Sequence, residues 1–132
     1  MTTFQIVALY VALTLLLNIV LMLRVGRGRL GKGINLGDGG DADMTARIRA
    51  HGNYIENAPL MLIGLLAVAF MNGSPILLHV LGAAYLIGRV LHALAMAGTM
   101  GQGRLIGTVL SLLVYLVMGL YLLYLIFLHG PA

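Results

Sequence analysis

Long apolar runs, each interrupted by few polar residues, dominate the sequence. A helix that crosses the hydrocarbon core of a membrane needs about 20 mostly apolar residues. Residues 4–23 carry no charged side chain, and none follows Arg104 as far as residue 128. Two further stretches, at about 46–70 and 75–97, are apolar apart from a few polar residues. The pattern predicts four membrane-spanning helices, at about residues 4–24, 43–71, 74–97 and 104–128.

Local signals indicate where these helices begin. Asp41 or Asp43 is positioned to cap the second helix, and Ser74 offers a capping hydroxyl directly before Pro75. A glycine-rich basic loop is expected over about 24–40. Because short connections favour antiparallel neighbours, we expect an all-α fold, an integral membrane four-helix up-down bundle.

The composition agrees with a single membrane domain over residues 1–132. Hydrophobic residues make up 61% of the chain and charged residues only 9%. Cysteine is absent, which excludes disulfides, thiolate metal sites and a thiol nucleophile supplied by the chain. No metal site is expected.

The net charge of +4 indicates membrane topology rather than binding to nucleic acid. Basic residues surround the first loop and follow the third helix: Arg24, Arg27, Arg29, Lys32, Arg47, Arg49 and Arg104. The second loop (71–74) and both ends carry no Lys or Arg. The positive-inside rule therefore places the first and third loops in the cytoplasm and both termini outside. Anionic membrane lipids are an expected partner of the basic excess.

Residues 26–31 fit the pattern G-x-G-x-x-G, and with Lys32 they resemble part of a phosphate-binding loop. Both nucleotide-binding motifs need a strand before them and a helix directly after. Here a membrane helix precedes the motif, so a flexible basic linker is the better interpretation. Asp38, Asp41 and Asp43 are spaced wrongly for a calcium-binding loop.

A cluster of polar residues lies at the start of the second predicted helix. Arg49, Asn53 and Glu56 occupy positions i, i+4 and i+7 and so share one helix face. In the third helix, Arg89 and His92 are three residues apart. Ionisable groups at membrane depth cost roughly 2.5–3.5 kcal/mol each, and they usually mark a functional site.

These residue types suit the capture of an anionic, amide-rich small molecule. Arginine pairs with carboxylates, a glutamate accepts from an ammonium group, and asparagine serves a peptide bond. A structural ion pair of Glu56 with Arg49 or Arg89, fixing only the helix register, is the alternative. His79 and His129 fit no motif and are expected to be packing and terminal residues.

Two motifs resemble the MAPEG family, the membrane-associated proteins of eicosanoid and glutathione metabolism. They are R-A-H-x-N-x-x-E-N-x-P over residues 49–59 and G-R-V-x-H over 88–92. Helix number, chain length and the basic loop agree, and L-G-D-G-G-D at 36–41 resembles the bacterial branch.

The resemblance implies a homotrimer in a bacterial inner membrane, with glutathione as co-substrate bound between protomers near the cytoplasmic side. It assigns glutathione binding to seven residues: Arg24, Arg49, His51, Asn53, Glu56, Arg89 and His92. Arg104 matches the arginine that family enzymes place beside the glutathione sulfur. The implied activity is conjugation of glutathione to a lipophilic electrophile, or reduction of that electrophile.

One position departs from the family pattern, since Met96 stands where several family enzymes carry a tyrosine. Methionine cannot donate a hydrogen bond to a carboxylate or a thiolate. A non-catalytic lipid-binding or scaffold member of the family is therefore the first alternative. A small four-helix multidrug transporter is the second, although such transporters place their membrane glutamate in the first helix.

Overall fold

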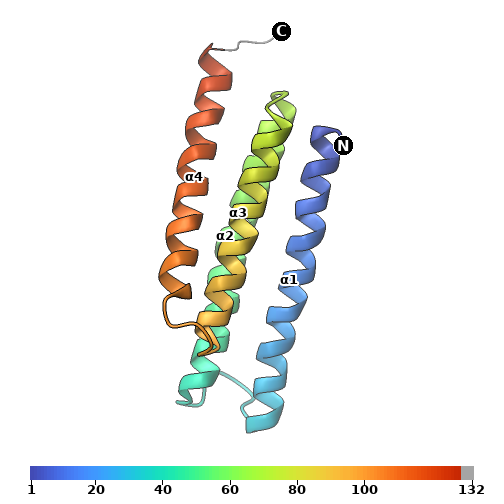
Figure 1. Ribbon diagram of the computed structural model, residues 1–132. Helices are drawn as coiled ribbons and strands as arrows, with labels where there is room; N and C mark the ends of the chain where they lie inside the picture. The colour runs from blue at the N-terminus through green and yellow to red at the C-terminus, as the bar shows by residue number, and fades with distance from the viewer. Residues whose placement is uncertain (129–132) are drawn as a thin grey trace.

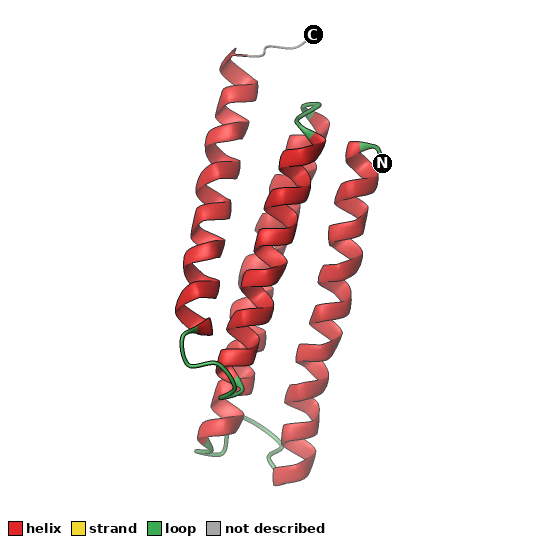
Figure 2. Cartoon of the chain, in the orientation of Figure 1, coloured by secondary structure: helices red, strands yellow, loops and turns green. Residues whose placement is uncertain are grey.

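The computed structural model describes residues 1–128 as four helices that run alternately up and down (Figure 1). They are α1 (Thr3–Lys32), α2 (Ala42–Phe70), α3 (Pro75–Met96) and α4 (Gly103–Leu128). Helices and short connections account for all the described residues (Figure 2). The predicted all-α four-helix architecture is confirmed; His129 lies outside the described residues.

The capping signals in the sequence operate as expected. The Asp41 carboxylate accepts a 2.7 Å hydrogen bond from the backbone N–H of Met44, and α2 starts at the next residue, Ala42. Ser74 accepts from the backbone N–H of Leu77, with Pro75 as the first residue of α3. These side chains satisfy N–H groups that have no partner inside the helix.

The expectation that the first helix ends near Arg24 is wrong, because α1 continues to Lys32. Gly28 lets α2 approach closely: a Cβ there would lie 2.9 Å from Cδ of Arg47. The Lys32 ammonium lies 2.6 Å from the Asp41 carboxylate, which ties the end of α1 to the start of α2. Gly33, with φ of 64°, then ends the helix in the left-handed conformation. The glycine motif at 26–31 is therefore helical and no phosphate-binding loop.

Helices α2 and α3 form the middle of the bundle, with α1 on one side and α4 on the other (Figure 1). Within the described residues, α1 and α4 do not contact each other. Small residues allow close packing at two levels. A Cβ on Gly82 would lie 2.5 Å from the Tyr10 ring, and one on Gly88 would lie 3.1 Å from the carbonyl oxygen of Gly107.

All four helices are long and apolar enough to cross a membrane. Exposed leucine, isoleucine and valine side chains cover the outer faces of α1 and α4. An apolar surface of this extent is typical of contact with lipid rather than water. The chain is thus an integral membrane protein built as a helical bundle.

Candidate functional site

Three helices surround a polar cavity of about 670 Å³ in the half of the bundle that holds the α3–α4 loop. Its lining combines charged, amide and apolar groups: Ile48, Arg49, Gly52, Asn53, Glu56, His92, Met96 and Arg104. The stripe predicted on α2 therefore faces the cavity, and α3 and α4 add His92 and Arg104. Five of the eight predicted site residues come together here.

The charged groups of the cavity have no ionic partner within residues 1–128. Arg49, Glu56 and Arg104 are all exposed, and none of them forms an ion pair there. The alternative of a structural ion pair between Glu56 and Arg49 or Arg89 is thus not realised within the described chain. Two guanidinium groups and one carboxylate stay available to a ligand or to a neighbouring copy.

Arg89 lies beside the cavity rather than in its lining, with only 4% of its surface exposed. Nη1 donates to the amide oxygen of Asn53 at 2.6 Å. Nη2 donates to the carbonyl of Gly107 at 2.9 Å and to the hydroxyl of Ser111 at 2.7 Å. Neutral acceptors from α2 and α4 therefore hold this buried cation, and Arg89 positions the cavity's amide, Asn53.

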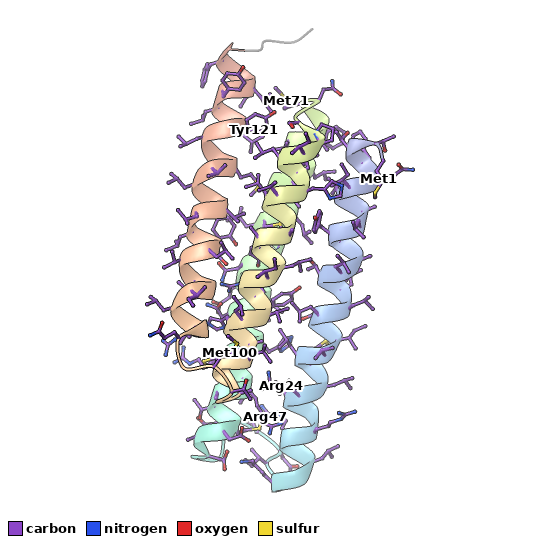
Figure 3. The ribbon with its side chains drawn as sticks, in the orientation of Figure 1. Met1, Arg24, Arg47, Met71, Met100 and Tyr121 are labelled. Carbon is purple, nitrogen blue, oxygen red and sulfur yellow. The ribbon has the colours of Figure 1, made fainter. Side chains whose placement is uncertain are left out.

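Neither His51 nor Arg24 lines the cavity: His51 on α2 contacts α1, and Arg24 lies on α1 itself. The His51 ring nitrogen Nε2 is 3.1 Å from the amide oxygen of Asn18. Arg24 donates to the carbonyl of Ala93 at 3.1 Å, and Arg47 donates to the carbonyl of Arg24 at 3.0 Å. Figure 3 shows Arg24 and Arg47 together at the lower end of the bundle. Within one chain, these side chains connect helices and do not line the cavity.

Sequence reasoning missed several polar partners that join the helices around the site. Asn18, in the first apolar run, bonds to His51. On α4, Ser111 accepts from Arg89, and the Tyr115 hydroxyl donates to the carbonyl of Asn57. An asparagine inside an otherwise apolar span was the available signal, since such side chains hydrogen-bond across helices. Among residues 1–128, no group of three or more His, Cys, Asp or Glu side chains is arranged to hold a metal ion.

The protein is thus an integral membrane four-helix bundle with a cationic, amide-lined cavity near one end. The MAPEG family matches residues 7–124, and the chain belongs to that family. It is 32% identical over 85 residues to "Inner membrane protein YecN" of Escherichia coli strain K12 and to the protein of the same name from Escherichia coli O6:H1 strain CFT073.

That match covers 64% of this chain and 65% of each relative, so it spans a little under two thirds of their length. The relatives are bacterial, in agreement with the branch that the first loop resembles. No solved structure matches the chain.

Proposed function

We propose that the protein binds glutathione in the α2–α3–α4 cavity and conjugates it to, or uses it to reduce, hydrophobic electrophiles. The observation that carries the proposal is the convergence of Arg49, Asn53, Glu56 and Arg104 on one cavity. Its volume of about 670 Å³ lies within the range of roughly 300–1,000 Å³ usual for small-molecule sites.

The chemistry of the lining fits a tripeptide with two carboxylates, one ammonium group and two amides. Arg49 and Arg104 supply cations for carboxylate or thiolate groups. Glu56 is the carboxylate that accepts from the ammonium group. Asn53, held by Arg89, presents an amide to the peptide backbone.

Arg104 is the proposed catalytic residue because a thiol reacts as its anion. An unperturbed thiol has a pKa of about 8.5 and is mostly protonated at neutral pH. A guanidinium beside the sulfur favours the thiolate and increases its population. The sulfur then forms a bond to an electrophilic carbon, the leaving group departs with its electron pair, and the thiol proton passes to solvent.

The proposed assembly is a homotrimer in the inner membrane, with the first and third loops cytoplasmic and both termini outside. Its support is the exposure of Arg49, Glu56 and Arg104 on helices that are apolar enough to span a membrane. Contact between such charges and lipid tails is costly, and a neighbouring copy relieves that cost. The bound ligand then lies between protomers.

Binding is tested by isothermal titration of glutathione into the detergent-solubilised protein. We expect saturable binding in the wild type, and affinity at least about tenfold weaker in Arg49→Ala, which removes charge-assisted hydrogen bonds. Arg27→Ala is the matched control, because Arg27 is an exposed arginine on α1 outside the cavity. Absence of wild-type binding at millimolar glutathione would end the proposal.

Met96 supports a second candidate, a non-catalytic lipid-binding or scaffold member of the family. Its thioether lines the cavity and cannot donate a hydrogen bond to the sulfur. An aryl halide assay separates the two candidates. Equal, blank-level rates for the wild type and Arg104→Ala favour the non-catalytic protein, whereas a wild-type rate that Arg104→Ala abolishes supports the enzyme.

A further inference from the structure

The end of α1 extends beyond what a membrane crossing requires. Its 30 residues give a length of about 45 Å at 1.5 Å per residue, whereas the hydrocarbon core is about 30 Å thick. At this end, α1 and α2 reach past the α3–α4 loop (Figure 1). The last turns of α1 therefore lie at or beyond the level of the lipid headgroups.

Two leucines at this end of the bundle are unusually exposed, Leu30 on the last turns of α1 and Leu36 in the loop that follows. Leu36 is 91% exposed and Leu30 is 86% exposed, the largest values for any large hydrophobic side chain in residues 1–128. Neither lies in the uncharged run that crosses the membrane. Exposure of both leucines to water is unfavourable by the hydrophobic effect, so contact with an apolar partner would stabilise this end of the bundle.

The lipid-facing stripe of α1 continues without a break onto the extension. Leu16, Leu23 and Leu30 are each seven residues apart, and all three are exposed. Arg27 is also exposed and lies on the same face, four residues after Leu23 and three residues before Leu30. The exposed apolar face of α1 in the span is thus the face that carries Arg27 and Leu30.

Arg27 differs from its basic neighbours in having no partner. Lys32 pairs with Asp41 and Asp43, and Arg47 pairs with Asp43. For Arg27, no hydrogen bond or ion pair occurs with any residue from 1 to 128. Its charge is therefore free to meet an anion at the depth of the headgroups.

We propose that Arg27 and Leu30, on one face of α1, form a docking site for an anionic phospholipid. The phosphate of the headgroup pairs with the Arg27 guanidinium, and Leu30 on the same face contacts an apolar part of the same lipid. Charge complementarity and continuity with the lipid-facing stripe select a lipid as the occupant. The site is independent of the cavity and does not rest on glutathione binding.

The test uses the full chain reconstituted in vesicles of equal parts phosphatidylcholine and phosphatidylglycerol, followed by native mass spectrometry of retained lipid. One cation near an anionic surface is expected to favour phosphatidylglycerol about fivefold. Arg27→Gln should lose that preference, and Arg27→Lys should keep it. Leu30→Ser should reduce the amount of lipid retained, while Ile76→Ser, a matched exposed position at the opposite end, should not.

Three results overturn the proposal. The first is an unchanged lipid preference in Arg27→Gln. The second is removal of the preference by inorganic phosphate, which indicates a site for free anions. The third is a changed oligomeric mass in Leu30→Ser with unchanged lipid retention, which indicates that a second copy covers Leu30. Because Arg27 and Leu30 are exposed, circular dichroism of these variants is expected to match the wild type.

Discussion

The guanidinium of Arg89 donates a 2.6 Å hydrogen bond to the amide oxygen of Asn53, and this contact joins α3 to α2 beside the cavity. The same guanidinium reaches Gly107 and Ser111 on α4. No carboxylate among residues 1–128 pairs with it. Three helices thus share one buried cation that is held by neutral oxygen atoms.

Asn53→Ala is expected to lower the free energy of unfolding by about 1.5–3 kcal/mol, the usual cost of losing a hydrogen bond to a charged group. The reason is that Nη1 of the buried Arg89 loses its acceptor. Thermal unfolding in detergent without glutathione measures the effect. Gln102→Ala removes a comparable amide from an exposed loop position and should change stability by no more than about 0.5 kcal/mol. Equal melting temperatures for the two variants would contradict the expectation.

Gly82→Ala is expected to destabilise the bundle by about 1–3 kcal/mol, because the new methyl group meets the Tyr10 ring. That ring cannot move away easily, since the Tyr10 hydroxyl donates to the His79 carbonyl at 2.9 Å. Gly119→Ala is the matched control in α4, where a Cβ meets nothing within 4 Å. Alanine favours a helix more than glycine does, so unfolding measurements should show the control as neutral or stabilised.

Acid is expected to loosen the junction between α1 and α2. The hydrogen bond from Lys32, followed by that from the Met44 N–H, holds the pKa of Asp41 below its usual value of 3.8. A lowered folded-state pKa stabilises the fold fully above pH 3.8, and this contribution is lost as the pH falls through the folded value. Asp41→Asn keeps a capping oxygen without titrating there, so its melting temperature should fall less between neutral pH and pH 3. Parallel curves for the two proteins would argue against a role for this carboxylate.

If Arg104 stabilises the thiolate, Arg104→Ala should shift the pH dependence of the rate of glutathione conjugation to higher pH. Without the cation the pKa of the glutathione thiol rises, and each unit of rise reduces the thiolate population about tenfold at neutral pH. Rates at alkaline pH should therefore recover toward the wild-type value. Stopped-flow measurement of the aryl halide reaction across pH checks this, with Arg27→Ala as control. A uniform loss of rate at every pH would instead indicate a role in binding.

The number of spans, their order and two of their starts could be predicted because apolar length and capping residues are local properties. Asp41 and Ser74 cap their helices as the sequence indicates. The end of α1 was misjudged because three glycines in the stretch 24–32 suggested a loop. Contacts with α2, above all through Gly28 and Lys32, override that local tendency and extend the helix.

The residues of the candidate site could be predicted where they share one face of a single helix. They could not be predicted where long side chains reach from one helix to another. The spacing of Arg49, Asn53 and Glu56 places all three on the cavity face of α2. Periodicity cannot reveal that Arg24 ends on a carbonyl of α3, or that His51 meets an asparagine of α1. Those outcomes depend on the relative register of two helices, which no single segment encodes.

The separation of α1 from α4 has a mechanical consequence. Because α2 and α3 stand between them, a change in the tilt of α4 reaches α1 only through these two inner helices. Within residues 1–128 of one protomer, α4 therefore has no direct contact through which it could displace α1. Substitutions on the two outer helices should have additive effects on stability.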